Sequence, residues 1–289
     1  MRATFLVNPH AGKGRAPQLA HALADNLRSS GHEIAVIEKE SLAEAQKSLI
    51  ENLSVFPPER VVVFGGDGNV HWSVQSLVQS QCALEVIPTG TGNDFARTHN
   101  FAKRRAIDPS ASKIAIDLGK ISYAQGERYF GQILSTGFDS LVNKRANEIK
   151  FLRGRLKYSV ATLLELREFK PIPYVITVDG KRRSIKAVLV AVGNGDSYGG
   201  GMKLIPMANP RDGKLDILIL HAVSTFTLLR VFPRIFSGRH VKHPAVEILS
   251  GKRIIIDSKA LVYADGEYVT RGKITVEVLP AALNIVAKP

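Results

Sequence analysis

The 289-residue sequence contains one cysteine, Cys82, and eight histidines that show no metal-ligand spacing. A single cysteine excludes an intrachain disulfide framework and a zinc site built from cysteines, and it is typical of a reducing compartment. The histidines do not form an HExxH pattern or a comparable motif. We therefore interpret most of them as ordinary surface or core residues.

Long apolar runs are also lacking. The longest uninterrupted run is Ala187–Val192, whereas a membrane-spanning helix needs about 20 apolar residues. The apolar run near the beginning of the sequence, Ala3–Val7, is too short for the core of a signal peptide. We therefore expect a cytoplasmic protein whose association with a membrane is peripheral.

Acidic residues are the third shortage, with 26 Asp and Glu against 39 Lys and Arg and a formal net charge of +13. This excess favours an anionic partner, either a nucleotide, a nucleic acid or a membrane surface rich in acidic lipid. Nucleic acid is the weakest of the three, because no recognition motif is present. Hydrophobic residues at 45% and charged residues at 22% indicate a folded globular chain, and the length favours two domains.

The first half of the sequence repeats a strand, a loop and a helix four times. The expected strands are Ala3–Val7, Ile34–Ile37, Val61–Phe64 and Leu84–Ile87, and helices are expected near Pro17, after Ser41, after Gly68 and from Asn93. This alternation predicts a doubly wound α/β domain, which binds ligands at the carboxyl ends of its strands.

The second half is mostly strands. We expect strands at Ile114–Ile121 and Arg128–Leu134, a helical stretch at Asp139–Phe169, strands from Val175 onward and one helix at about Thr225–Phe236. The pair Asp179-Gly180 predicts a tight hairpin. The fold class is thus α/β plus β, with a nucleotide-binding domain at 1–122 and a β-rich, sandwich-like domain at 123–289 whose last strand can return to the first domain.

Three glycine-containing loops stand where an expected strand passes into a helix, at residues 8–14 (NPHAGKG), 65–68 (GGDG) and 90–94 (GTGND). Main-chain N–H groups at helix starts, with no Cβ in the way, can hold a phosphate. Three such loops in successive units of one sheet predict a shared nucleotide site. The P-loop pattern and a clean GxGxxG are absent, which disfavours an ordinary P-loop enzyme and an NAD-binding Rossmann domain.

In this order and spacing the loops resemble the diacylglycerol kinase catalytic domain, and in particular its soluble bacterial lipid-kinase branch, which is related to the sphingosine kinases. The resemblance continues through nearly the whole chain with Phe95-Ala96-Arg97, Gly193-Asn194-Gly195, the glycines at 199–201, Pro206-Met207-Ala208, the run 212–216 and Asp265-Gly266-Glu267. The ordered set is far more specific than any one of its members.

The resemblance implies an ATP-dependent lipid kinase with ATP and Mg²⁺ as cofactors and ATP held between the two domains. The expected acceptor is diacylglycerol, which gives phosphatidic acid. Ser41 stands where such kinases tend to have Thr. By position, nucleotide contacts fall on Asn8, Pro9, His10, Ala11, Gly12, Ser41, Gly65, Gly66, Asp67, Gly68, Asn69, Val70, His71, Thr91, Asn93 and Asp94.

The resemblance also implies catalytic roles for three carboxylates. Glu267 is the expected general base with Asp265 beside it, and Asp67 orients the Mg²⁺ and the phosphates. A carboxylate suffices as the base because phosphoryl transfer depends mostly on positioning and charge neutralisation. On the residues alone, Asp265-Gly266 is typical of a hairpin turn.

A second, structural Mg²⁺ is implied near the other Asp-Gly pair, at residues 212–213. Its ligands are the side chain of Asp212 and the main-chain oxygens of Leu215 and Ile217, since oxygen ligands suit a hard cation. Asp216 competes for the same role. On the residues alone, this pair is also typical of a turn before a strand.

Two departures from the family pattern keep alternatives open. Asn69 stands where Thr is usual, and Trp72 stands where Glu is usual, which is compatible with a catalytically weak nucleotide- or membrane-binding relative. An NAD kinase is a second enzyme hypothesis, because it shares the GGDG loop and a β-rich second domain. The run Gly90–Arg97 and the late Asp-Gly-Glu favour the lipid kinase.

Two basic segments are candidates for contact with an anionic membrane. Ala222–His243 has no acidic residue, and Lys144–Arg167 sets basic residues beside an apolar helical stripe. Each is also typical of a helix that packs its apolar face on the domain and exposes a solvated basic face. The edge strands expected in the second domain are compatible with a homodimer.

Overall fold

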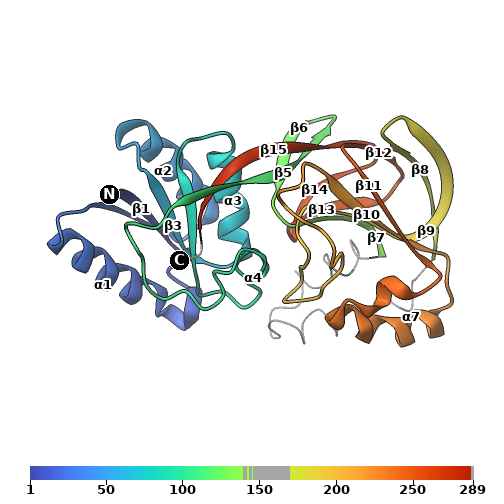
Figure 1. The fold of residues 1–289 in the computed structure, drawn as a ribbon, viewed down its shortest axis with the longest axis horizontal. Coiled ribbons are helices and arrows are strands. Elements are labelled where there is room, and N and C mark those ends of the chain that lie inside the picture. The colour runs from blue at the N-terminus through green and yellow to red at the C-terminus, as the bar shows by residue number, and fades with distance from the viewer. Residues whose placement is uncertain (139–141, 143–144, 146–169, 288–289) are drawn as a thin grey trace. The chain divides into compact units, whose positions relative to one another are not determined.

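The computed structural model describes residues 1–138, 142, 145 and 170–287, in two compact units (Figure 1). Unit 1 comprises Met1–Ile116 and Ala281–Pro289, and unit 2 comprises Asp117–Pro280. The strands β5 (Lys113–Tyr123) and β15 (Ile274–Val286) run from one unit into the other, so the boundary expected after residue 122 falls inside β5. The helix expected at Asp139–Phe169 and the basic segment Lys144–Arg167 lie outside the described residues.

Unit 1 is built on a parallel sheet in the order β2-β1-β3-β4. Its strands are β1 (Arg2–Val7), β2 (Glu33–Glu38), β3 (Arg60–Gly65) and β4 (Ala83–Pro88). Residues Asn284 and Ile285 of β15 pair in parallel with β4 at the edge of this sheet. Every residue of β3 and β4 is buried, as expected for strands of a sheet that is covered on both faces.

Helices cover both faces of the sheet of unit 1. The helix α1 (Ala16–Ser29) packs on the face that carries Phe5, whereas α2 (Leu42–Val55) and α3 (Asp67–Leu77) pack on the face that carries Leu6. Neighbouring residues of a strand point to opposite faces, so this placement is the predicted doubly wound arrangement. The short helix α4 (Asp94–Thr98) follows β4.

The local sequence explains where two of these helices begin. Pro17 lies in the first turn of α1, where its missing N–H group costs nothing. The hydroxyl of Ser41 accepts a hydrogen bond from the N–H group of Glu44 at 3.2 Å and caps α2.

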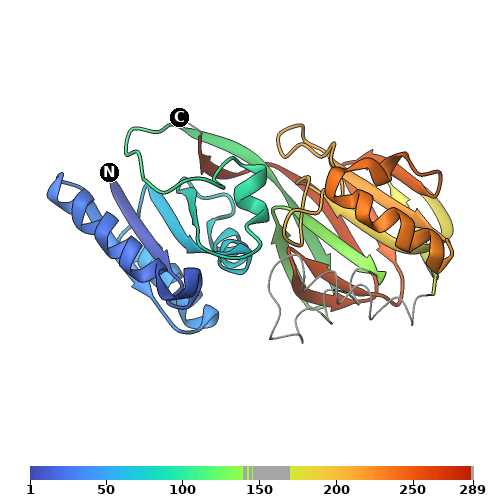
Figure 2. The same ribbon diagram turned by 90° about the horizontal axis from the view of Figure 1, so that it is seen from below.

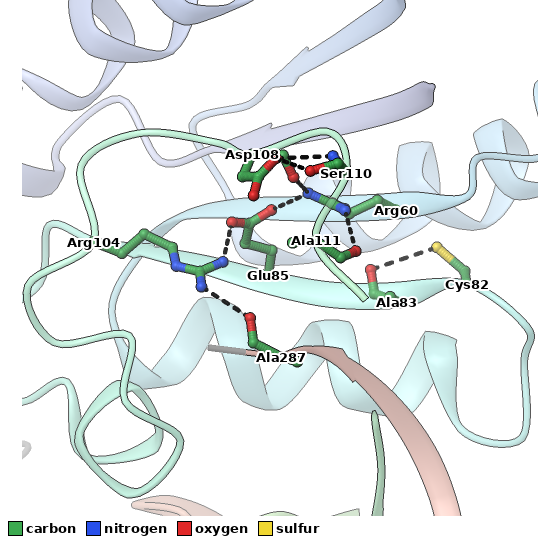
Figure 3. A network of polar contacts seen from close by, with 9 residues as sticks. All are labelled: Arg60, Cys82, Ala83, Glu85, Arg104, Asp108, Ser110, Ala111 and Ala287. Atoms are coloured by element: carbon green, nitrogen blue, oxygen red, sulfur yellow. Dashed lines mark hydrogen bonds and ion pairs between the residues drawn. The ribbon is translucent and has the colours of Figure 1, made fainter. Parts of the chain in front are cut away.

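A buried charge network fastens the connection after α4 to the sheet of unit 1 (Figure 3). Glu85 of β4 is fully buried, and its carboxylate accepts hydrogen bonds from Arg60 at 2.9 Å and from Arg104 at 2.5 Å. Arg60 also donates to two carbonyl oxygens within residues 108–111, and Arg104 donates to the carbonyl oxygen of Ala287 at 3.1 Å. This network is not apparent from the sequence, because Glu85 lies inside an otherwise apolar run.

Unit 2 is β-rich, as predicted. Its strands run in the order β14-β13-β7-β9-β8-β12-β15, while β10 pairs with β9 and β11, and β6 pairs with β5. The bounds are β6 (Gly126–Phe130), β7 (Ile133–Gly137), β8 (Ile172–Val178), β9 (Lys181–Gly193), β10 (Leu215–His221), β11 (Val246–Gly251), β12 (Arg253–Asp257), β13 (Leu261–Ala264) and β14 (Glu267–Arg271). The hairpin predicted at Asp179-Gly180 joins β8 to β9, with both turn residues at positive φ.

Two apolar clusters fill unit 2, and β10 contributes to both. Ile217 packs in one cluster with Tyr174, whereas Leu218 packs in the other beneath the helix α7 (Thr225–Val231). Because successive residues of β10 face different clusters, this strand is apolar on both faces. Its sequence is therefore a nearly continuous run of apolar residues, without the alternation of apolar and polar residues that a strand with one exposed face shows.

Two expected elements of unit 2 are divided in the structure. The helix expected at Thr225–Phe236 ends as α7 at Val231 and continues as two 3-10 turns, η2 (Phe232–Ser237) and η3 (Arg239–Lys242). Pro233 explains the change, because it lacks the N–H group that an α-helix needs. The strand expected at Arg128–Leu134 is divided into β6 and β7, because residues 131–133 donate their N–H groups to a side chain.

Candidate functional site

The three predicted glycine loops lie together at the carboxyl ends of β1, β3 and β4. In the first loop, η1 (Ala11–Gly14), the N–H group of Gly12 donates to the carbonyl oxygen of Thr89 at 2.9 Å. The N–H group of Gly90 in the third loop donates to the carbonyl oxygen of Gly65 in the second at 3.2 Å. Each loop is therefore hydrogen-bonded to a neighbour, and the three form one surface of unit 1.

Main chain touches main chain between the second and third loops. A Cβ atom on Gly90 would lie 2.5 Å from the Cα atom of Gly66, and a Cβ atom on Gly92 would overlap the Oδ2 atom of Asp67. Only glycine fits at these positions. The absence of side chains lets an anion come close to the main-chain N–H groups here and at the start of α3.

Asp67 connects the second loop to the third. Its Oδ1 atom accepts hydrogen bonds from the N–H groups of Asp94 at 2.7 Å and Phe95 at 3.2 Å. These donors lie in the first turn of α4, which the residue before it, Asn93, cannot cap because it has a left-handed conformation with φ 57°. Asp67 therefore acts as the cap of α4 from a distant loop, a role that its sequence position did not reveal.

Asn69, the first departure from the family pattern, joins the second loop to the first. Its buried side chain accepts a hydrogen bond from the Nδ2 atom of Asn8 at 3.0 Å. The side chain leaves no room at Gly65, where a Cβ atom would lie 2.8 Å from the Oδ1 atom of Asn69. Asn69 thus lacks the small hydroxyl of the Thr that the family pattern has here, and its amide instead forms a hydrogen bond between the first and second loops.

Trp72, the second departure, belongs to the packing between α3 and α2. Its ring lines a shallow apolar depression with Leu42, Ala45 and Leu49 of α2. This position lies one turn along α3 from the loop residues. The aromatic ring therefore has a structural explanation that is independent of nucleotide binding.

The other predicted nucleotide residues differ in exposure. Thr91 and His10 are exposed, and His10 forms an ion pair with Glu40 at 2.6 Å between Nε2 and Oε2. The side chains of Val70, His71 and Asp94 are buried, so these three belong to the frame of the loops. The remaining loop residues belong to the same surface and are partly exposed, except for Gly65, which is buried: they are Asn8, Pro9, Gly65, Gly66, Asp67, Gly68 and Asn93. Ser41 is the exposed cap of α2.

In unit 2, Asp265-Gly266 forms the two-residue turn between β13 and β14, with φ values of 51° and 88°. The carboxylate of Asp265 accepts hydrogen bonds from the main-chain N–H groups of Gly131, Gln132 and Ile133 at 3.0, 2.9 and 3.1 Å. The sequence placed Asp265 beside the base as a catalytic residue. Its contacts are those of a group that fixes the β6–β7 connection.

Glu267 begins β14, directly after this turn, and is half-buried. Among the described residues, no hydrogen bond or ion pair holds its carboxylate. Its position is instead fixed by the main chain, since Glu267 pairs with Ala264 across the hairpin. A carboxylate that the protein positions without neutralising it is available to accept a proton.

Asn194 is a polar residue of the same region, and its role is not apparent from the sequence. Its side chain is buried, and Nδ2 donates to the carbonyl oxygens of Asp117 at 2.8 Å and Gly131 at 3.0 Å. Asn194 and Asp265 thus hold the β6–β7 connection from two sides. The Gly193-Asn194-Gly195 motif was the available signal, because small neighbours leave room for such contacts.

The predicted metal residues lie at the start of β10. Asp212 is exposed, and its Oδ1 atom accepts a hydrogen bond from the N–H group of Lys214 at 3.0 Å. Burial raises the pKa of the Asp216 carboxyl, and the nearby Asp212 charge raises that pKa further, against the lowering effect of the hydrogen bond with Ser250. Leu215 and Ile217 are buried members of the β10–β11 ladder.

This set of oxygen donors is compatible with a hard cation, because a positive charge would favour the ionised form of Asp216, which burial disfavours. Within residues 1–138, 142, 145 and 170–287, no group of three or more His, Cys, Asp or Glu side chains could hold a metal ion. A cation here would therefore depend on main-chain oxygens.

A largely apolar pocket lies beneath α7 in unit 2. Its lining comes from the sheet, from the 198–204 loop and from the inner face of α7 and η2. The residues are Phe138, Val142, Leu189, Tyr198, Met202, Leu204, Leu218, Leu220, Leu228, Val231, Phe232, Ile235, His240 and Val246. The pocket is not apparent from the sequence, because its walls come from segments far apart in the chain.

Family models match both halves of the chain. Residues 2–123 match the diacylglycerol kinase catalytic domain, and residues 132–287 match the YegS C-terminal NAD kinase beta sandwich-like domain. A protein of Mycobacterium tuberculosis named diacylglycerol kinase is 36% identical over 292 residues, covering 98% of this chain and 94% of the relative. A diacylglycerol kinase of Bacillus subtilis is 25% identical and covers 92% of this chain and 90% of its own length.

A solved structure has the same fold. The crystal structure of a diacylglycerol kinase from Bacillus anthracis superposes with a TM-score of 0.74 at 22% identity, covering all of this chain and 97% of the other. Among the residues that the structure describes, no helix has the length and apolar content needed to cross a bilayer.

Proposed function

The chain belongs to the diacylglycerol kinase family and is a lipid kinase, and from this we propose that it transfers the γ-phosphoryl group of ATP to the hydroxyl of diacylglycerol, giving phosphatidic acid. The relatives disfavour the NAD kinase hypothesis, since two that match nearly the whole chain, at 36% and 25% identity, are named diacylglycerol kinase. The protein would act from the aqueous side of a membrane, as a peripheral enzyme.

The observation that carries this proposal is the joined surface of three glycine loops in unit 1. Close main-chain contact at Gly66 and Gly90 and the link from Asn8 to Asn69 support the binding of a phosphate chain there. Asp67 would keep the second and third loops in register while it orients the phosphates. Bound Mg²⁺ would supply neutralisation of the phosphate charge.

Glu267 would act as the general base of the transfer. The lipid hydroxyl oxygen forms a bond to the γ-phosphorus, the bond from that phosphorus to the bridging oxygen of ADP breaks, and the hydroxyl proton passes to the Glu267 carboxylate. A loose transition state needs little proton transfer until late, so a carboxylate suffices as the base. Asp265 would be a positioning residue for this turn.

The apolar pocket beneath α7 would receive part of an acyl chain of the lipid. Its lining combines aliphatic and aromatic side chains with few polar groups, which suits a hydrocarbon ligand. The pocket is thus proposed to bind the acyl chain of the acceptor lipid, whereas the glycine loops are proposed to bind ATP.

The proposal is tested by transfer of labelled phosphate from ATP to lipids in mixed micelles. The panel holds diacylglycerol, monoacylglycerol, phosphatidylglycerol, ceramide and sphingosine, with NAD as a soluble control. We expect labelled phosphatidic acid as the main product. A labelled product only from NAD, or from none of the lipids while ATP is bound, would contradict the assignment of the acceptor.

We further propose that Asp212 and the main-chain oxygens of Leu215 and Ile217 bind a structural Mg²⁺, with Asp216 as its neighbour. In Asp212→Ala, we expect the melting temperature to lose the increase that Mg²⁺ gives the unchanged protein. The raised pKa of Asp216 adds a pH dependence. Its protonated form is favoured in the fold, so without metal its contribution to stability is present at low pH and lost as the pH rises through that raised pKa.

The ionised Asp216 carboxylate would add negative charge beside the cation, so the stabilisation by Mg²⁺ should grow as the pH rises across the same interval. Thermal melts with and without Mg²⁺ at several pH values measure this. Asp257→Ala, at the end of β12, serves as a control that removes a carboxylate elsewhere in unit 2. An equal response to Mg²⁺ in the unchanged protein and in Asp212→Ala would remove the metal site.

A further inference from the structure

The segment formed by α7, η2 and η3 has two faces of different character. It lies on the outside of unit 2 in both ribbon views (Figure 2). Its inner face, with Leu228, Val231 and Ile235, is buried against the sheet. Its outer face is not covered by any described residue, so packing within unit 2 explains only half of the segment.

The outer face combines exposed apolar side chains with arginines. Phe226 and Leu229 are 73% and 45% exposed, and Arg230 and Arg234 are exposed beside them. Positions 226, 229 and 230 follow the helical spacing i, i+3 and i+4 within α7, which places them on one side of that helix, and Arg234 follows in η2. A phenylalanine exposed to this extent has a cost in water that a partner would remove.

The charge of this face is uncompensated. Arg230, Arg234, Arg239 and Lys242 form no ion pair with any described residue, and residues 222–243 contain no Asp or Glu. Elsewhere in unit 2 some cations have partners, such as Arg253 with Glu277 at 3.0 Å and Lys120 with Glu127 at 2.6 Å. The face therefore presents positive charge to an external anion.

We propose that this face of α7, η2 and η3 docks the protein on an anionic lipid bilayer, with Phe226 and Leu229 inserted among the acyl chains and the four cations at the headgroups. Apolar tips flanked by arginines match the interface of a bilayer, where one layer is hydrocarbon and the next is charged. An acidic protein partner would match the charge, but the combination of two neighbouring exposed apolar side chains with several cations favours lipid.

This inference rests on the proposed function in one respect: an enzyme that phosphorylates a membrane lipid must reach the membrane. The test is binding of the full chain to sedimented vesicles in the absence of ATP, so it does not depend on turnover. The vesicles are phosphatidylcholine alone and phosphatidylcholine mixed with phosphatidylglycerol. If the protein binds vesicles but phosphorylates no lipid of the panel, the proposed activity is contradicted and the docking face is retained. If it phosphorylates a lipid but does not bind vesicles, the docking face is contradicted and the activity is retained.

We expect the chain to bind the mixed vesicles and to bind neutral vesicles much more weakly, with the difference reduced at high salt. Arg230→Gln with Arg234→Gln should lower the partition coefficient by about fivefold for each arginine. Phe226→Ala with Leu229→Ala should lower it by about tenfold on both kinds of vesicle. Circular dichroism and melting curves verify that each variant is folded.

Matched control variants remove exposed cations or an exposed apolar side chain outside α7, η2 and η3. Arg182→Gln with Lys186→Gln takes two exposed cations from β9, and Val55→Ala takes an apolar side chain that is 83% exposed at the end of α2. Both controls should bind as the unchanged protein does. Equal losses in controls and test variants, or no binding of the unchanged protein to anionic vesicles, would overturn the proposal. Loss of self-association in Phe226→Ala without vesicle binding would assign the face to a second copy of the chain instead.

Discussion

Replacing Glu267 by Gln should abolish phosphoryl transfer while the protein stays folded and still binds ATP. Glutamine has the same shape but cannot accept the hydroxyl proton, and loss of a general base typically costs about 10²–10⁴-fold in rate. No described residue forms a hydrogen bond or ion pair with the Glu267 carboxylate, so the substitution removes no structural contact. The measurement is kcat with diacylglycerol in mixed micelles, together with ATP binding by calorimetry.

The neighbouring Asp265 provides the matched control. Asp265→Asn should lower thermal stability, because three main-chain N–H groups of the β6–β7 connection lose part of a charged acceptor. We expect a loss of about 1–3 kcal/mol in the free energy of unfolding. Its kcat should fall far less than that of Glu267→Gln. Turnover retained in Glu267→Gln, or the opposite ranking of the two variants, would remove Glu267 from the role of the base.

Replacing Glu85 by Gln should destabilise unit 1 severely. The substitution leaves the guanidinium groups of Arg60 and Arg104 buried without a counter-charge, and breaking a buried ion pair from one side costs about 3–5 kcal/mol. In a unit of this size, that loss corresponds to a fall of about 10 °C or more in melting temperature. Scanning calorimetry measures it, with circular dichroism to verify the folded state at low temperature.

An exposed pair in the same unit is the control for this prediction. Glu33 pairs with Arg2 at 3.2 Å, and both side chains are largely exposed, so Glu33→Gln should cost less than about 1 kcal/mol. Glu85 lies inside β4 and contacts none of the glycine loops, so the ATP affinity of folded Glu85→Gln protein should be unchanged. Similar melting temperatures for the two variants would show that the buried network is not a source of stability.

Local chemistry was enough to predict much of this protein. The hairpin at Asp179-Gly180 requires two residues at positive φ, and the cap of α2 requires a hydroxyl before Glu44; both signals are complete within four residues. The buried strand β3 was predicted in the same way from its uninterrupted valines. The break of the helix after Val231 was also present in the sequence as Pro233, and the prediction gave that signal too little weight.

The glycine spacing brought residues 8–14, 65–68 and 90–94 into one hypothesis, and the structure joins these loops through hydrogen bonds. The family pattern carried the prediction one step further, to Glu267. It also marked Asn69 and Trp72 as departures that put the site in doubt. The structure explains each by a contact with another segment, Asn8 for Asn69 and α2 for Trp72.

What the sequence determined by itself is the order of strands and helices, the turns, and the loops that can approach an anion, because each depends on residues close together in the chain. Only the tertiary structure decided that Asp67 caps α4, that Asp265 holds residues 131–133, and that Glu85 neutralises two arginines. These carboxylates bind groups far away in sequence, and no local signal distinguishes them from solvated ones. Their roles depend on which segments the fold brings within hydrogen-bonding distance and away from water, where a charge must find a partner.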